Sequence, residues 1–256
     1  MACDSMKKTL SIMMTAYDRA HLLGPTLESL HFQTRRADQI VVVEDGSDGG
    51  KTEAVCAQHK VAGLPIEYFR RVNRPAVGFS NPAVPKNIGI RKCTGEVIII
   101  QGAEVKYTKS TDVENLVVPV EADPSVSMFA PCRSLNQDGS EGIWYGDPVH
   151  THYLGFCHAV RRDRVIAIGG YDERFRGYGR EDDDFAWRLH VSGITYKWAP
   201  EVLTIHQWHP GHPDPKDAEN DKFNSELGGQ VIEDYYKNKT RGLESNVGLD
   251  WGNINS

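Results

Sequence analysis

The sequence predicts an α/β fold with a mostly parallel central sheet flanked by helices. Short apolar stretches alternate with segments of helical periodicity along the first hundred residues. In such an order each strand is followed by a right-handed crossover, so the sheet is parallel and covered on both faces. The chain has 256 residues, of which 39% are hydrophobic, and this is enough to bury a sizeable core.

The first half of the chain carries the clearest alternation. Each expected strand is an apolar run that ends at a polar or glycine-rich turn, and the first helix repeats leucine at helical spacing. Strands are expected at residues 10–15, 39–43, 66–70 and 96–100. Helices are expected at residues 17–30, 52–60 and 87–91.

The second half is less regular. Strands are expected at residues 126–131, 156–160, 195–198 and 202–205, and helices at 113–120, 162–169, 182–192 and 217–237. We expect the last helix to be interrupted at Gly228 and Gly229, and residues 134–152 to form a polar, aromatic loop. The pattern predicts one domain over residues 1–210, then a helical extension and a mobile tail over residues 211–256.

Composition narrows the class of partner and the compartment. A net charge of −6 argues against nucleic acid as a partner, because nucleic-acid binding needs a basic face. The five cysteines are scattered, which suggests neither a zinc site nor a disulfide framework and favours a reducing compartment. No run approaches the roughly 18 apolar residues of a membrane span, and the N-terminus lacks a signal-peptide core. We therefore expect a cytoplasmic protein.

Polar clusters follow three of the predicted strands, at residues 15–17, 44–47 and 101–104. Ligands of open parallel sheets bind beyond the carboxyl ends of the strands, so these clusters predict a binding site. The sequence lacks a GxGxxG motif after the first strand and lacks a P-loop motif. Classical dinucleotide-binding folds and P-loop NTPases are therefore disfavoured.

Four consecutive carboxylates, at residues 181–184, open a predicted helix after a glycine-rich stretch. The free N–H groups and the dipole of a helix N-terminus lower the cost of such a charge cluster. A carboxylate held ionised in a cleft can act as a general base, whereas the structural alternative is a solvated, capping acidic turn. Asp184 and Arg188 are four residues apart, which predicts an ion pair on the helix, and Asp183 and Asp184 are expected to cap the helix or face solvent.

The order of the motifs resembles that of glycosyltransferases of the GT-A fold, similar to family 2 and to galactosyltransferase-type catalytic domains. The motifs are Thr-x-Tyr-x-Arg at 15–19, Val-Val-Val-Glu-Asp-Gly-Ser at 41–47, Pro-Lys-Asn-Ile-Gly-Ile at 85–90, Gly-Gly-Tyr-Asp-Glu-Arg-Phe at 169–175, Glu-Asp-Asp-Asp-Phe at 181–185 and Ile-His-Gln-Trp-His at 205–209. The resemblance covers residues 10–209 and makes residues 1–210 the catalytic domain. It implies transfer of a hexose or N-acetylhexosamine from a UDP-sugar to a hydroxyl of a glycan or glycolipid acceptor, with inversion.

The same resemblance implies which residues bind the donor. Tyr17 would stack on the nucleobase, and Asp45 would accept a hydrogen bond from uracil. Lys86 and Asn87 would lie beside the ribose and diphosphate. The full implied set is Thr15, Tyr17, Arg19, Asp45, Lys86, Asn87 and Gly170.

A divalent cation, Mn²⁺ or Mg²⁺, is the expected cofactor, because most enzymes of this fold use one to neutralise the leaving diphosphate. The family places an Asp-x-Asp after the fourth strand, but residues 101–104 read Gln-Gly-Ala-Glu here. Glu104 is the one carboxylate of that turn and becomes the candidate ligand. His206 is the second candidate metal ligand, with His209 and His212 as possible substitutes. The departure leaves metal dependence open.

On the acceptor side, the resemblance implies that Asp182 is the general base and that Glu181 binds an acceptor or donor hydroxyl. Two other interpretations stay open. A retaining transferase would need a different catalytic arrangement, and a non-catalytic nucleotide- or sugar-binding domain would fit the missing Asp-x-Asp. The donor sugar, the acceptor, the linkage and the oligomeric state are also left open.

Overall fold

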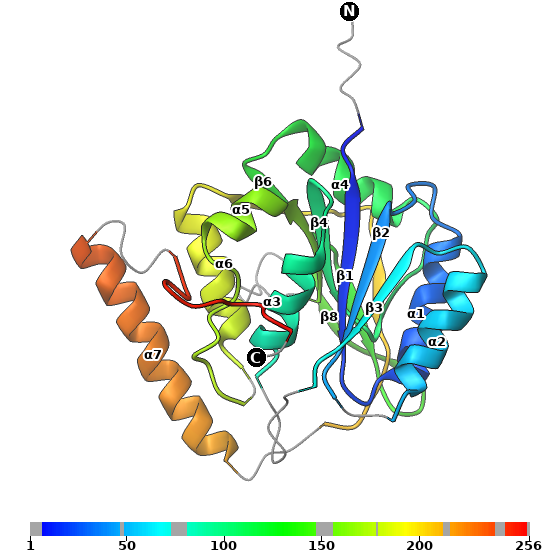
Figure 1. Cartoon of the computed structure of the whole chain (residues 1–256). Helices are drawn as coiled ribbons and strands as arrows, with labels where there is room; N and C mark the ends of the chain where they lie inside the picture. The colour runs from blue at the N-terminus through cyan, green and yellow to red at the C-terminus, as the bar shows by residue number, and fades with distance from the viewer. Residues whose placement is uncertain are drawn as a thin grey trace, which may run out of the picture.

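The computed structural model describes residues 7–46, 49–72, 81–146, 156–177, 179–211, 216–238 and 244–254. A seven-stranded central sheet runs through the molecule in the order β10-β6-β9-β4-β1-β2-β3 (Figure 1). Its strands are β1 (Leu10–Ala16), β2 (Gln39–Glu44), β3 (Ile66–Arg70), β4 (Val97–Gly102), β6 (Val126–Phe129), β9 (Cys157–Arg161) and β10 (Thr195–Trp198). The predicted α/β architecture is confirmed.

The sheet is mostly parallel, as predicted. Strands β4, β1, β2 and β3 are parallel neighbours, and β10 is parallel to β6. Only β9, among the described strands of this sheet, runs antiparallel to its neighbours β4 and β6. The register sets Thr15 of β1 opposite Val43 of β2 and Gly102 of β4. The carboxyl ends of these three strands therefore meet at one edge of the sheet.

Helices cover both faces of the central sheet, and each face has its own apolar core (Figure 1). One face packs against α1 (Ala20–His31), α2 (Lys51–Val61) and α4 (Asp112–Ala122). The other packs against α3 (Ala83–Lys92), α5 (Arg162–Ala167) and α6 (Glu181–Val191). Strand β1 serves both cores, because Ile12 and Met14 point to the first and Met13 to the second. Burial on both faces explains the continuous apolar runs of the strands.

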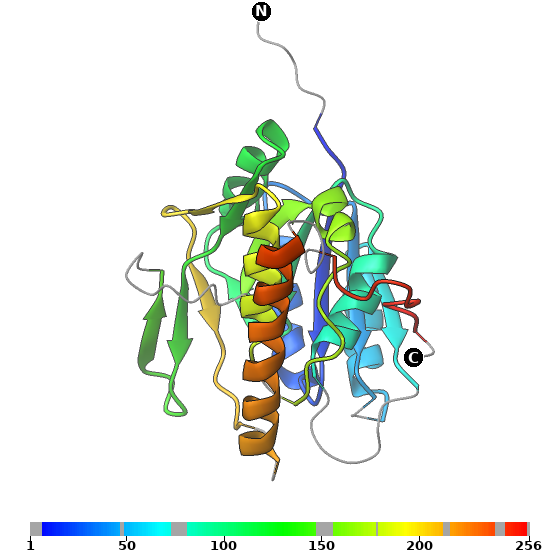
Figure 2. The same ribbon diagram turned by 90° about the vertical axis from the view of Figure 1, so that its left-hand side faces the viewer.

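A second, four-stranded sheet stands beside the first, in the order β5-β11-β7-β8 (Figure 2). Its strands are β5 (Val105–Tyr107), β7 (Cys132–Leu135), β8 (Glu141–Tyr145) and β11 (Thr204–His206). The prediction of a loop over residues 134–152 is therefore wrong for the described part of that stretch. Here the pairing sets Arg133 opposite Trp144, with the guanidinium carbon 4.8 Å from the indole centroid. No periodic pattern in the local sequence signals this cross-strand contact, so the two strands were not predicted.

Helix α7 (Asp217–Asn238) runs along α6 without a break, so the predicted interruption at Gly228 and Gly229 is wrong (Figures 1 and 2). Each interior glycine costs a helix roughly 1 kcal/mol relative to alanine. The buried side chains of Leu227 and Val231 flank the pair and pack against Phe175, which anchors the helix across the glycines. Among the described residues, none of the helices combines the length and the apolar character that crossing a bilayer requires.

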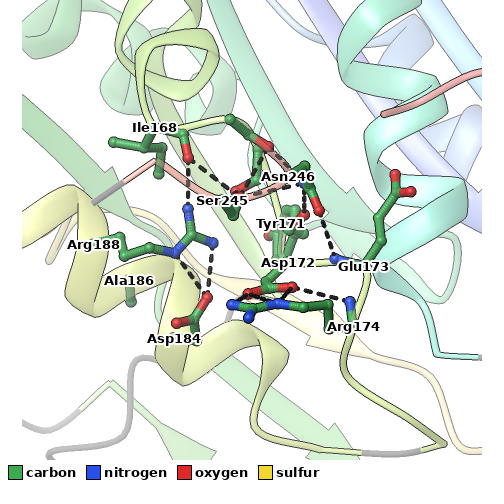
Figure 3. A network of polar contacts seen from close by, with 12 residues as sticks. Ile168, Tyr171, Asp172, Glu173, Arg174, Asp184, Ala186, Arg188, Ser245 and Asn246 are labelled. Carbon is green, nitrogen blue, oxygen red and sulfur yellow. Dashed lines mark hydrogen bonds and ion pairs between the residues drawn. The ribbon is translucent and has the colours of Figure 1, made fainter. Parts of the chain in front are cut away.

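Residues 244–254, part of the tail expected to be mobile, pack against the loop between α5 and α6. Asn246 Nδ2 donates to the carbonyl oxygens of Gly169 and Tyr171 at 2.8 and 2.7 Å. The Ser245 backbone N–H donates to the Ile168 carbonyl at 2.9 Å, and the Ser245 hydroxyl lies 3.3 Å from the same carbonyl oxygen (Figure 3). Gly169 has a φ of +74°, and a Cβ there would lie 2.1 Å from the Ser245 oxygen. The tail and this tight turn therefore fit each other closely.

We predict that Asn246→Ala lowers the free energy of unfolding by about 1–3 kcal/mol, because it removes two hydrogen bonds from buried carbonyl groups. Urea denaturation followed by circular dichroism measures this difference. The control is Gln58→Ala, which removes an exposed amide on α2 and is expected to change stability little. Equal stability of the two variants would contradict a structural role for residues 244–254.

Candidate active site

A cavity of about 410 Å³ lies at the carboxyl ends of β1, β2 and β4. Its volume falls within the range of small-molecule sites, and its place is the one that open parallel sheets use for ligands. Nine sequence-predicted residues line it: Thr15, Tyr17, Arg19, Asp45, Lys86, Glu104, Glu181, Asp182 and His206. The structure therefore brings the separate motifs to one place.

One side of the cavity presents a fixed carboxylate. Asp45 follows β2 and is buried, and Arg71 Nη1 donates to its Oδ1 at 3.1 Å. The Asp45 backbone N–H donates to the Ala16 carbonyl at 2.9 Å, which ties the turn after β2 to the end of β1. Sequence analysis missed Arg71, although its place directly after the third predicted strand was a usable signal.

Arg19 supplies a cation to the cavity. It directly precedes α1, and its Nη2 lies 3.0 Å from His209 Nδ1. Burial lowers the pKa of Arg19, and the nearby Glu104 and Asp18 carboxylates act in the opposite direction. A guanidinium is far from losing its proton at neutral pH even so. The residue therefore remains a cation that suits an anionic ligand.

Glu104, His206 and His209 form a cluster whose ligand atoms all lie within 4.8 Å of one another. Glu104 Oε1 lies 3.7 Å from His206 Nε2. One carboxylate and two imidazoles fit Mn²⁺ or another borderline divalent metal better than Mg²⁺, which prefers oxygen ligands. The residues present therefore fit a divalent-metal site. His209 joins the predicted pair, whereas His212 lies outside the described residues.

The backbone explains why these three side chains meet. Strand β11 pairs with β5 and sets His206 opposite Val105, directly after Glu104. Next along the chain, Gln207 points to the protein interior. Its backbone N–H donates to the Glu104 carbonyl at 3.0 Å, and its side-chain amide donates to the Leu22 carbonyl at 3.0 Å. Gln207 thereby fastens the histidine segment to both the Glu104 turn and α1.

Gln101, the first residue of the Gln-Gly-Ala-Glu turn after the fourth predicted strand, is committed to the interior of that turn. Its Nε2 donates to the Val105 carbonyl at 3.0 Å, and its Oε1 accepts a hydrogen bond from the Tyr107 hydroxyl at 2.6 Å. The Gln101 side chain therefore shapes the turn that presents Glu104.

The imidazole of His206 is held in a form that can bind a metal. Burial lowers the pKa of His206, His209 and Arg19 act in the same direction, and Glu104 opposes them. The neutral ring therefore predominates at neutral pH, which is the form that donates an electron pair to a metal.

A second charged cluster joins α3 to the start of α6. Lys86 Nζ lies 2.5 Å from Asp182 Oδ1 and 3.3 Å from Glu181 Oε1. The Asp182 side chain is 32% exposed and that of Glu181 only 5%. Burial raises the pKa of Glu181 to about 7, the neighbouring Asp182 adds to the effect, and Lys86 opposes it. Burial alone would lower the pKa of Lys86, but Asp182, Tyr171 and Glu181 raise it, so the lysine stays charged.

The remaining acidic residues of this region have structural partners. Asp184 is buried, which corrects the expectation that it caps the helix or faces solvent, and its Oδ2 lies 2.7 Å from Arg188 Nη2. Arg188 Nη1 also donates to the Ile168 carbonyl at 2.8 Å (Figure 3). The predicted ion pair four residues apart is confirmed. Asp172 is bound in turn by Arg174.

Asn87 and Gly170 are not among the described residues that line the cavity. Asn87 is fully buried, and its amide exchanges two hydrogen bonds of 2.8 Å with the Tyr171 backbone. Gly170 has a φ of +70°, and a Cβ there would lie 2.4 Å from Asn87 Oδ1. Both residues therefore hold α3 against the loop before α6, instead of lining the space expected for the donor.

Two proteins of known sequence are similar to parts of the chain. The uncharacterized glycosyltransferase YfnE of Bacillus subtilis is 37% identical over 74 residues, which cover 27% of this chain and 19% of YfnE. The N-acetylglucosaminyl-diphospho-decaprenol L-rhamnosyltransferase of Mycobacterium tuberculosis is 22% identical over 251 residues, which cover 83% of this chain and 80% of that protein. The similarity to YfnE thus spans about a fifth of its length.

Among solved structures, GalNAc-T7 with UDP, GalNAc and Mn²⁺ superposes with a TM-score of 0.69. The sequence identity is 17%, and the match covers 93% of this chain and 52% of GalNAc-T7. At this identity the likeness concerns the fold, and it confirms the GT-A fold that the sequence predicted.

The family model described as glycosyl transferase family 2 matches residues 11–184. This range is more than half of the chain. It contains the strand-end residues Thr15 and Asp45 and both carboxylates at the start of α6, and it ends before the two histidines. The chain belongs to glycosyl transferase family 2.

Proposed function

We propose that this protein transfers a hexose or N-acetylhexosamine from a UDP-sugar to a hydroxyl of a glycan or glycolipid acceptor, with inversion at the anomeric carbon. One observation carries the proposal: a single cavity joins a strand-end carboxylate, a three-residue metal cluster and a carboxylate pair on α6. The names of the similar proteins support it, since one is a rhamnosyltransferase named for a diphospho-decaprenol glycolipid and another is a structure with UDP, GalNAc and Mn²⁺.

At the donor end, the Asp45 carboxylate is the group that would accept the N–H of uracil. Its ion pair with Arg71 keeps one oxygen engaged and fixes the direction of the other. Tyr17 supplies a ring for stacking and Thr15 a hydroxyl at the same edge. Arg19 faces the cavity as a cation that would lie beside the diphosphate.

Glu104, His206 and His209 are the residues that would hold the metal, and two imidazoles beside one carboxylate fit a transition-metal cation such as Mn²⁺ better than Mg²⁺. When bound, a divalent cation neutralises the negative charge that develops on the leaving diphosphate. Arg19, which lies 3.0 Å from His209, would add a second positive charge at the same place.

At the acceptor end, Asp182 is the proposed general base, because it is the more exposed of the two carboxylates and faces the cavity. It would take the proton of the acceptor hydroxyl while the oxygen attacks the anomeric carbon opposite the diphosphate. One such displacement inverts the configuration. Lys86 must then release Asp182 when the acceptor enters. The lysine keeps Glu181 as its ion-pair partner.

Calorimetric titration of the protein with UDP, with and without Mn²⁺, tests the proposal directly. We expect binding that requires Mn²⁺. Binding of equal strength without metal would keep the donor site but contradict the metal cluster, and absence of binding in both conditions would contradict a UDP-sugar donor. NMR of the product's anomeric proton then separates inversion from retention.

We predict that Asp182→Asn reduces transfer by roughly 10²- to 10⁴-fold, the usual contribution of a general base, while UDP affinity changes little. The measurement pairs a transferase assay with UDP calorimetry. The matched control is Asp183→Asn, which removes an exposed carboxylate from the next position of the same helix. Full transferase activity of Asp182→Asn would contradict the assignment of Asp182 as the general base.

His206→Ala is expected to weaken Mn²⁺-dependent UDP binding roughly tenfold or more, because loss of even an outer-shell partner of a metal costs that much. Calorimetry at fixed Mn²⁺ concentration measures the change. His190→Ala, an exposed histidine on α6, serves as the control. Unchanged metal affinity in His206→Ala would rule out a ligand role.

The pH dependence of stability is expected to change in Glu181→Gln. Burial raises the pKa of Glu181 in the folded chain from 4.5 to about 7, so between these values the folded state keeps a proton that the unfolded state has released. That contribution to stability is complete below about pH 4.5 and is lost as the pH rises through 7. Glutamine mimics the protonated acid. In urea denaturation, the free energy of unfolding of the variant should therefore rise relative to that of the native chain as the pH rises. Parallel pH profiles of the two proteins would contradict the shifted pKa.

A further inference from the structure

We propose that Glu28, His31 and His59 form a second divalent-cation site, suited to Zn²⁺, that links α1 to α2. The ligand atoms of these three side chains all lie within 4.8 Å of one another. The described residues around the active-site cavity include none of them, so this site is separate from the Glu104 cluster.

The two imidazoles already have the spacing that a shared metal requires. His31 Nε2 lies 3.2 Å from His59 Nδ1. With Zn–N distances of about 2.0–2.1 Å and tetrahedral angles, two nitrogen ligands of one zinc ion lie about 3.3 Å apart. The separation of the two nitrogens therefore already matches that of two ligands of one zinc ion, and only the direction of the rings has to change.

The fold brings the ligands from two helices. Glu28 and His31 are three residues apart on α1 and so share one face of that helix. His59 comes from α2, which packs beside α1 on the same face of the sheet. His59 is buried, His31 is half-buried and Glu28 is exposed, so the cluster opens to solvent on the Glu28 side. Three protein ligands and a water molecule complete a common zinc arrangement.

The helix ends add an electrostatic reason for a cation at this place. His31 is the last residue of α1, and His59 lies in the last turn of α2. Carbonyl groups at a helix C-terminus carry partial negative charge, which favours a cation nearby. The competing interpretation is a plain hydrogen bond between two neutral rings, and this contact would gain nothing from added metal.

Zinc titration of the full chain tests the proposal, in a background that lacks the active-site histidines. In the His206→Ala/His209→Ala variant we expect one Zn²⁺ to bind, and the melting temperature to rise with Zn²⁺ concentration. Co²⁺ in place of Zn²⁺ should give the visible absorption of a tetrahedral nitrogen and oxygen site.

Adding His31→Gln or Glu28→Gln to this background should weaken Zn²⁺ binding roughly tenfold or more. Both side chains reach solvent, so these variants are expected to fold, whereas replacing the buried His59 could disturb the packing of α2. The matched control is His21→Gln, an exposed histidine of the same helix. Absence of Zn²⁺ binding, or binding that neither added substitution weakens, would overturn the site and leave the hydrogen-bond interpretation.

Discussion

The contact between Lys86 and the carboxylates of Glu181 and Asp182 constrains the active-site half of this molecule. Two adjacent acidic groups beside a buried surface repel each other and lose hydration, so they need a cation held close by. Lys86 meets both from α3, at 3.3 and 2.5 Å. The N-terminus of α6 must therefore face α3 at a fixed separation, and the segments between these helices have to keep that separation.

That separation is maintained by groups far from one another in the sequence. Asn87, next to the lysine, binds both backbone groups of Tyr171, and Asn246 binds the carbonyls on either side of Gly170. Figure 3 shows how Ser245 and Asn246 lie against the turn at Ile168, while Arg188 reaches the same turn from α6. The acidic cluster is thus positioned by a layer of buried amide contacts, and the C-terminal segment belongs to that layer.

The sequence predicted those parts of the fold and site that local pattern determines. Strands buried on both faces appear as apolar runs, and their carboxyl ends identify Thr15, Asp45 and Glu104 without any knowledge of tertiary contacts. Asn87 could not be assigned in this way, because the same Lys-Asn pair could serve a ligand or a neighbouring backbone. Strands β7 and β8 and the packing of residues 244–254 were missed for the same reason, since long-range pairing decides them.

The proposed metal cluster of Glu104, His206 and His209 departs from the Asp-x-Asp pattern in a way that the surrounding contacts support. Gln101 keeps its side-chain amide within the turn that presents Glu104, and Gln207 fastens the segment that carries His206 and His209 to the same turn. With nitrogen ligands in place of oxygen ligands, such a cluster would favour a transition-metal cation such as Mn²⁺ over Mg²⁺. It also ties metal binding to the protonation of histidine. Because burial lowers the pKa of His206, this ring stays neutral, and so able to bind a metal, further into the acid range than a free histidine.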